Sequence, residues 1–148
     1  MASINVFIKG HEELEKKYYQ RSTRLKQTTP QALSEIGKLL KTHVTKFIKK
    51  KTGNKTETRY SPTRTVRVSS PGAYPNHDRG RLVKGIRSFV KRKPGGKYNL
   101  NFQSKAPYAL DLEFGTRNMA ARPYMRPTLK ANRKRINAII TKGVRRAL

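Results

Sequence analysis

Few residues of this chain are suited to acid–base or metal chemistry, and they are scattered. Asp111 and Glu113 stand two positions apart, which places both carboxylates on one face if their segment is a strand. His77 and Asp78 are adjacent, but they lack the further ligands that a metal hydrolase needs. Serine, histidine and aspartate all occur without the motif of an activated serine. We therefore expect no enzyme activity, no catalytic residue, no metal ligand and no cofactor.

The stronger chemical signal is positive charge. The chain has 35 Lys and Arg against 8 Asp and Glu, a formal net charge of +27 over 148 residues. Such a charge opposes compact folding and self-association unless anions or an acidic partner lie nearby. The hydrophobic fraction of 34% is low for a globular domain, so we expect part of the free chain to be loose. Composition thus favours an anionic partner.

Two basic segments carry the candidate contacts to that partner. In the segment 51–78, arginines alternate with tyrosines, a pattern suited to phosphate backbones or stacked bases. From Arg117 onward the chain has ten basic residues and no acidic one, more than a helix dipole could use. The candidate contacts to DNA or to an acidic partner are Arg59, Arg64, Arg67, Arg133, Lys134 and Arg135.

The chain has no cysteine, which excludes disulfides and thiolate metal sites. Its first residues lack the basic and apolar regions of a signal peptide. No apolar run approaches the roughly 20 residues that span a bilayer. We expect a protein that folds in a cytoplasm and has no membrane partner.

The most specific pattern lies between Tyr108 and Pro127. It consists of an aromatic-Ala pair, then Glu-Phe-Gly-Thr, a gap, and Ala-x-Pro-aromatic-Met-Arg-Pro. Its positions, called the signature below, are Tyr108, Ala109, Glu113, Phe114, Gly115, Thr116, Ala121, Pro123, Tyr124, Met125, Arg126 and Pro127. A shorter upstream pattern, His-x-x-Gly-x-Leu, contains Gly80 and Leu82.

Together these patterns resemble the gene-ten-product-like family of tail-component or neck proteins of tailed bacteriophages. That family usually has Thr where this chain has Arg79, so the upstream match is only supportive. The resemblance spans nearly the whole chain and implies a structural virion protein that is assembled in the host cytoplasm. Such a protein would form a ring in the neck that joins the DNA-filled head to the tail, as a head–tail connector or tail-completion protein.

The resemblance also implies partners. They are further copies of the chain in the ring, head-closure or adaptor proteins, and tail-terminator or tail-tube proteins. DNA in the lumen, bound without sequence specificity, is a further candidate. The alternative is a free basic nucleic-acid-binding protein, which explains the charge but not the signature. No helix-turn-helix, zinc or RNA-recognition motif is visible.

The signature residues also allow a reading that needs no family. Gly115 can adopt a positive φ where the apolar run 109–114 stops. Pro123 and Pro127 each disfavour helix in the preceding residue, so the chain should run extended and enter a helix at Pro127 or Thr128. The residues alone predict a loop that docks a terminal helix.

The elements that position these residues begin with helices. Ile4 to Ile8 alternates as a strand does, and His11 to Gln27 is typical of a helix with acids in its first turn. Thr28 to Pro30 predicts a restart, because it offers a cap residue and a first-turn proline. The core helix that follows carries apolar residues at a 3.6-residue period: Leu33, Ile36, Leu40, Val44, Phe47 and Ile48.

The segment 51–78 is too long for a simple connection, and we predict a flexible basic loop with a β-hairpin over Thr63 to Val68 as the alternative. A short helix or a helix passing into a strand is expected over 81–89. Pro94-Gly95-Gly96 predicts a turn before a strand over 98–104.

The segment 108–114 fits a short helix or a strand, and in a strand Leu112 and Phe114 would face inward. The C-terminal helix, 128–148, has an apolar stripe of Leu129, Ile136 and Ile140. We predict one α+β domain, 1–148: a small antiparallel sheet packed with a long core helix and a basic C-terminal helix, with the basic loop between.

Overall fold

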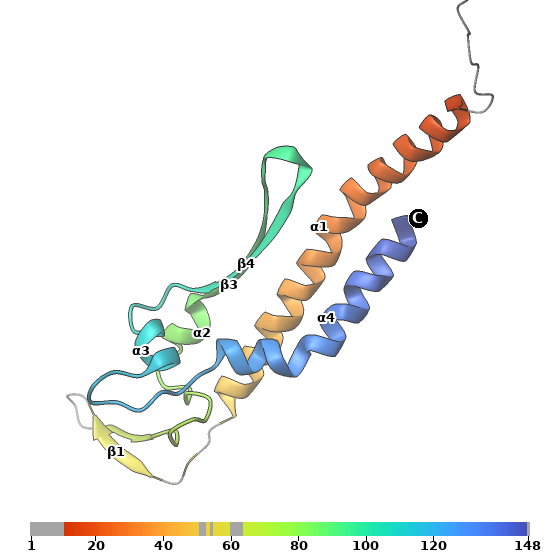
Figure 1. The fold of residues 1–148 in the computed structure, drawn as a ribbon. Coiled ribbons are helices and arrows are strands. Elements are labelled where there is room, and N and C mark those ends of the chain that lie inside the picture. The colour runs from red at the N-terminus through yellow and green to blue at the C-terminus, as the bar shows by residue number, and fades with distance from the viewer. Residues whose placement is uncertain (1–10, 51–52, 54, 60–63, 148) are drawn as a thin grey trace, which may run out of the picture.

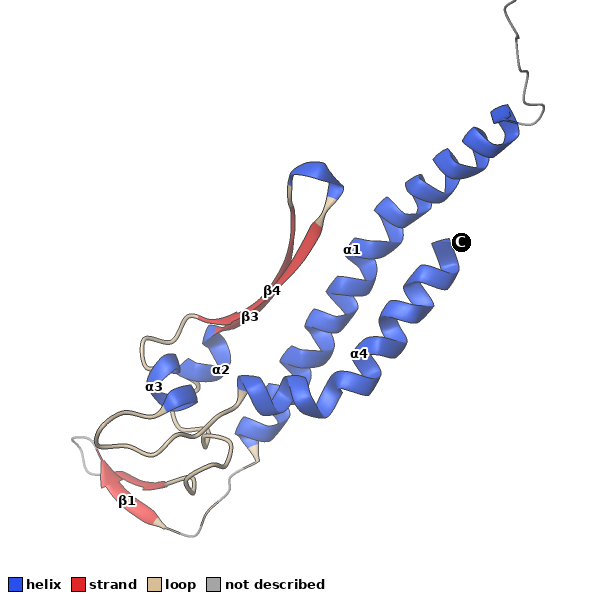
Figure 2. Cartoon of the chain, in the orientation of Figure 1, coloured by secondary structure: helices blue, strands red, loops and turns tan. Residues whose placement is uncertain are grey.

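The computed structural model describes residues 11–50, 53, 55–59 and 64–147, so the strand expected at Ile4 to Ile8 lies outside the described residues. The chain is α+β, as the sequence predicts (Figure 1). Helix α1 (His11–Lys49) and helix α4 (Met125–Ala147) lie side by side and antiparallel. A hairpin of strands β3 (Ile86–Arg92) and β4 (Tyr98–Ser104) runs along another side of α1 (Figure 2). The described strands form two separate two-stranded antiparallel sheets, not one.

Helix α1 is continuous through Pro30, so the predicted break at Thr28 to Pro30 is wrong. A proline inside a helix leaves the carbonyl four residues earlier without its usual N–H donor. That carbonyl belongs to Lys26, and the hydroxyl of Tyr98 donates to it at 3.3 Å. A residue 72 positions away thus replaces the lost backbone hydrogen bond.

The apolar stripe of α1 forms the core as predicted, with Ile36, Leu40, Val44 and Ile48 buried. Phe47 differs, because it is partly exposed at the edge of this stripe. Its ring packs against His43 and Tyr74, with centroids at 4.5 and 5.0 Å. The core cluster is completed by residues from helix α2 (Arg81–Gly85), from β3 and from the position just before α4: Leu82, Ile86 and Tyr124.

Two glycines let other elements approach helices closely. A Cβ on Gly37 of α1 would lie 2.8 Å from Ser88 Oγ and 3.1 Å from Leu100 Cδ1, both on the β3–β4 hairpin. A Cβ on Gly143 of α4 would lie 3.1 Å from the Cβ of Ala32 on α1. Helix α1 is therefore held on both sides by contacts in which a larger side chain would not fit.

Helix α2 (Arg81–Gly85) passes directly into β3 (Ile86–Arg92), which confirms the predicted helix-to-strand transition. The turn η1 (Pro94–Gly96) leads into β4 (Tyr98–Ser104), also as predicted. The pairing runs from Ile86 opposite Ser104 to Arg92 opposite Tyr98. The next segment is helix α3 (Ala109–Phe114), so the strand alternative there is wrong.

The segment 51–78 contains the hairpin that the sequence left as an alternative, with different bounds. Strand β1 (Thr56–Arg59) pairs with β2 (Arg64–Arg67). The segment also packs on the body: Val66, Ser69 and Pro75 are buried, and the N–H of His77 donates to the carbonyl of Ile48 at 3.0 Å. None of the helices in the described ranges is long and apolar enough to cross a membrane.

Candidate functional site between helices α3 and α4

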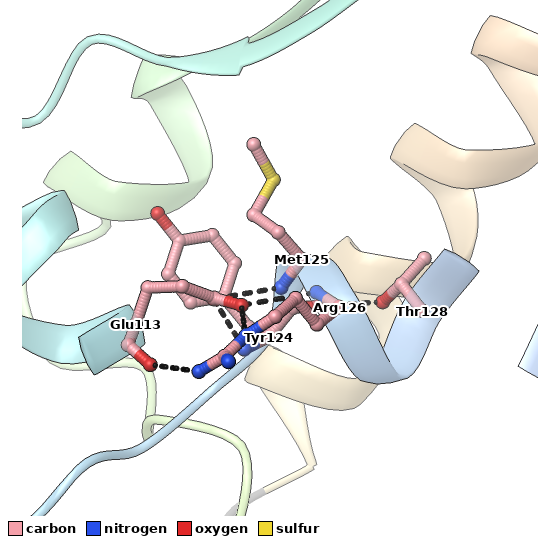
Figure 3. A network of polar contacts seen from close by, with 5 residues as sticks. All are labelled: Glu113, Tyr124, Met125, Arg126 and Thr128. Carbon is pink, nitrogen blue, oxygen red and sulfur yellow. Dashed lines mark hydrogen bonds and ion pairs between the residues drawn. The ribbon is translucent and has the colours of Figure 1, made fainter. Parts of the chain in front are cut away.

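Glu113 is the centre of the signature. It lies in the last turn of α3, and only 5% of its surface is exposed. Its Oε2 accepts hydrogen bonds from the backbone N–H groups of Tyr124 and Met125, both at 2.9 Å (Figure 3). Its Oε1 accepts from the backbone N–H of Arg126 at 3.0 Å and from Arg126 Nε at 3.2 Å. The first N–H groups of a helix have no partner within it, so Glu113 caps α4 from another helix.

The same contacts set the charge of Glu113. Burial raises the pKa of this carboxyl, but hydrogen bonds from the N–H groups of Met125, Tyr124 and Arg126, together with the Arg126 side chain, outweigh burial and hold the pKa below its usual value. The positive end of the α4 dipole favours the same ionised form. Glu113 is thus an ionised cap with both carboxylate oxygens engaged.

The carboxylate pair considered from the sequence does not form. Asp111 and Glu113 lie two residues apart on a helix, which points them to nearly opposite faces. Asp111 is exposed and Glu113 is buried. In the described part of the chain, no three His, Asp or Glu side chains group as a metal site.

Arg126 joins α4 to the end of α3. Its Nη2 donates to the carbonyl of Glu113 at 3.0 Å, and its guanidinium carbon lies 4.8 Å from the ring centroid of Phe114. Phe114 itself is 63% exposed, so the inward position that the strand alternative gave it is not found. The reason is the helical period, which turns Glu113 inward and leaves Phe114 on the outer face, under the Arg126 side chain.

Gly115 ends α3 with φ 81° and ψ 175°, a conformation that is essentially restricted to glycine. A Cβ there would lie 2.8 Å from the carbonyl oxygen of Met119 and 2.9 Å from the nitrogen of Ala121. The turn behind it is closed by backbone hydrogen bonds in both directions between Thr116 and Met119, at 2.8 and 3.2 Å. The signature glycine is therefore required by conformation and by space.

Tyr124 is 1% exposed and belongs to the core cluster, and burial raises its pKa. Its carbonyl accepts a hydrogen bond from Thr128 Oγ1 at 2.6 Å. Thr128 Oγ1 also forms a hydrogen bond with the hydroxyl of Tyr74 at 3.1 Å. Tyr74 thus ties the segment before α2 to α4. Pro123 precedes Tyr124 and keeps the chain extended up to the helix.

Helix α4 begins at Met125 and not at Pro127 or Thr128 as predicted. Pro127 occupies its first turn, where a missing N–H is harmless. Arg126 is helical although it precedes a proline. Glu113 explains the earlier start, because it supplies acceptors for the N–H groups of Tyr124 to Arg126.

The upstream pattern lies against the signature. Gly80 adopts φ 76° at the start of α2, and Leu82 is buried in the core cluster. Both line a cavity of about 490 Å³ that is also lined by Tyr108, Leu112 and Thr116. Ala109 is buried at the start of α3. Two segments that are separate in the sequence therefore meet around one cavity.

The basic candidates are not gathered into one site. Arg67 on β2 and Arg133, Lys134 and Arg135 on α4 are exposed. Arg59 and Arg64 are paired in the β1–β2 register, and the structure describes only their backbone. Burial, the charge of Arg135 and the charge of Lys46 lower the pKa of His43.

The stripe expected on α4 is only partly its packed face. Leu129 and Ile140 are nearly half exposed, while Thr128 and Asn132 are buried. Asn132 Nδ2 donates to the carbonyl of Thr128 at 2.8 Å, which satisfies a polar side chain inside the helix contact. Polar residues that bond to their own helix were not recognised from the sequence as packing residues.

Arg122 was not predicted as a site residue. Its backbone N–H donates to the carbonyl of Leu112 at 2.7 Å, and its Nε donates to the carbonyl of Ser69 at 3.1 Å. It therefore bridges α3 and the segment that follows β2.

No protein-family model, curated protein or solved structure matches this chain.

Proposed function

We propose that the chain is a structural subunit of a bacteriophage neck, which assembles into a ring joining the DNA-filled head to the tail. The observation that carries the proposal is the convergence of the family-like residues on one unit. Gly80 and Leu82 line the same cavity as Tyr108 and Thr116. Glu113, which lies between Tyr108 and Thr116 in the sequence, caps α4. The residues that carry the family resemblance therefore lie together in the structure, around one cavity and one helix cap.

The rigid connection between α3 and α4 supports a structural role for the chain. Glu113 is ionised and fully hydrogen-bonded, so it fixes the direction in which α4 leaves α3. A buried, satisfied polar network makes an arrangement rigid and unique. Rigid presentation of a long helix is what a ring subunit needs to meet its neighbours at a constant angle.

The outer faces of α3 and α4 support a protein neighbour. Leu110 and Phe114 are exposed one helical turn apart on α3. Ile140 and Val144 are nearly half exposed and also lie one turn apart on α4. Exposed apolar side chains that gather in one place mark protein contacts, and we infer that these two pairs serve as such contacts. A head-to-tail contact between copies closes a ring when the rotation allows it.

The net charge defines what assembly requires. At +27, copies of this chain repel one another, and an acidic partner or DNA in the lumen would offset that repulsion. We assign Arg133, Lys134 and Arg135 on α4 to such an acidic protein neighbour. The alternative function, a free nucleic-acid-binding protein, rests on the charge alone.

The test is complementation in a phage that carries this gene. Without the gene product, lysates should contain filled heads and separate tails under negative-stain microscopy. The wild-type chain and the exposed-site control Glu35→Gln should restore joined particles, and Glu113→Ala should not. Normal titres of joined particles without the product would exclude the neck role and leave the nucleic-acid alternative.

A further inference from the structure

The β3–β4 hairpin ends in a cationic tip, Lys91 to Lys97. Four of its seven residues are basic, namely Lys91, Arg92, Lys93 and Lys97. All seven are exposed. The tip lies within a longer stretch, residues 79–110, that has nine Lys and Arg and no Asp or Glu. Positive charge is therefore concentrated on this arm without acidic residues nearby in the sequence.

The tip makes little use of its charge within the chain. Across the described ranges, no carboxylate forms an ion pair with any of its four cations. Lys91 Nζ lies 5.5 Å from the ring centroid of Phe89 on the same strand, so this cation contacts only its own arm among the described residues. Gly95 and Gly96 have φ of 74° and 72°, and nothing lies within 4 Å of where their Cβ atoms would be. The tip is thus open to a partner on its outer side.

The arm behind the tip is held in place. Ser88 and Leu100 pack against Gly37 of α1, and the Tyr98 hydroxyl at the base of the tip donates to the Lys26 carbonyl. The hairpin therefore follows α1 before its tip ends free, as Figure 1 shows. An arm fixed at its base loses less conformational entropy when its end binds.

We propose that this tip binds the phosphate backbone of duplex DNA without sequence specificity. The cores of protein interfaces are depleted in lysine and rich in aromatic side chains, whereas Pro94 is the only apolar residue of the tip. Exposed Lys and Arg are the usual partners of phosphate oxygens, and a two-stranded β-ribbon fits the major groove. The inference does not rest on the neck assignment, because it concerns the purified chain and DNA alone.

The first test measures how DNA affinity depends on salt. The arm variant is Arg92→Gln, Lys93→Gln and Lys97→Gln, and the control with the same charge change is Arg133→Gln, Lys134→Gln and Arg135→Gln. The slope of log affinity against log salt concentration is negative, and each phosphate contact contributes about 0.9 to its magnitude. For a short duplex of mixed sequence, the arm variant should reduce that magnitude by about 2 to 3. The control should lower it by less than about 1.

Thermal melting of both variants should match the wild type, because all six residues are exposed. An unchanged slope in the arm variant would overturn the proposal. Equal decreases in the two variants would also overturn it, because binding would then follow net charge and not the arm.

A second test uses the absence of cysteine. Lys93→Cys and Lys134→Cys each remove one charge and give one thiol for a photoreactive group. The Lys93 position should crosslink to the duplex at least several-fold more than the Lys134 position. Equal or weaker crosslinking at the tip would place DNA elsewhere on the chain and reject the proposal.

Discussion

The corner between α3 and α4 and the tip of the β3–β4 hairpin use charge in opposite ways. At the corner, the carboxylate of Glu113 is buried and accepts four hydrogen bonds, all from the start of α4. At the tip, four cations are exposed and none forms an ion pair in the described chain. Changes at the corner should therefore alter folding, and removal of the tip cations should alter only binding.

Glu113→Ala is the strongest test of the corner. It leaves the N–H groups of Tyr124, Met125 and Arg126 without their charged acceptor, so the free energy of unfolding should fall by about 4 kcal/mol. Glu35→Gln removes an equal charge from an exposed position of α1 and should cost less than about 0.5 kcal/mol. Urea unfolding of the two variants measures both. Equal losses would mean that the cap contributes nothing beyond its charge.

Gly115→Ala tests the turn with a smaller effect. The substitution forces a glycine-only conformation and places Cβ against two backbone atoms, so it should cost about 3 kcal/mol. Gly95→Ala at the hairpin tip also has a positive φ but meets no neighbour, and it should cost about 1 kcal/mol. The difference in cost, from urea unfolding, measures what the ψ of 175° and the close backbone contacts together add at Gly115, because Gly95 has the left-handed ψ of 18°. Equal costs would show that the turn at Gly115 relaxes to accept a side chain.

The pH dependence of stability should reveal the corner and not the tip. The folded pKa of Glu113 is lowered from 4.5, so its contribution is fully present above that pH and is lost as pH falls through the folded pKa. The stability difference between wild type and Glu113→Gln should therefore be constant at neutral pH and shrink below about pH 4.5. The stability difference between wild type and the triple arm variant, measured in the same way, should show no such change. A Glu113→Gln difference that stays constant down to low pH would mean that Glu113 is not stabilised as an anion.

How far the sequence predicted each region depended on whether its determinants were local. The hairpin was predicted from alternation in 98–104 and from Pro94-Gly95-Gly96, which act through neighbouring residues. The start of α4 was not, because its cap, Glu113, lies on another helix. Continuity of α1 was missed for the same reason, since Tyr98 replaces the hydrogen bond that Pro30 removes.

The sequence predicted which residues belong to the candidate site but not most of the contacts that they make. Gly115 was expected at a positive φ, and the structure confirms this. The direction of Phe114 stayed open because a six-residue segment fits either period, and only tertiary packing selects the helix. The cationic tip was not among the predicted contacts, although Lys91-Arg92-Lys93 before a turn was its visible signal.

Phe114→Ala gives the smallest effect expected at the corner and tests the boundary between its buried and exposed surfaces. Because Phe114 is 63% exposed, the variant should lose only the contact with the Arg126 guanidinium, about 0.5 to 1 kcal/mol of unfolding free energy. Tyr124→Ala, at an aromatic residue that is 1% exposed, should lose about 4 kcal/mol. Urea unfolding compares the two directly. If Phe114→Ala were nearly as costly as Tyr124→Ala, the outer face of α3 would be part of the core in the free chain. A small cost together with failed complementation would instead assign Phe114 to a contact between subunits, because the side chain would then matter only once a partner covers it.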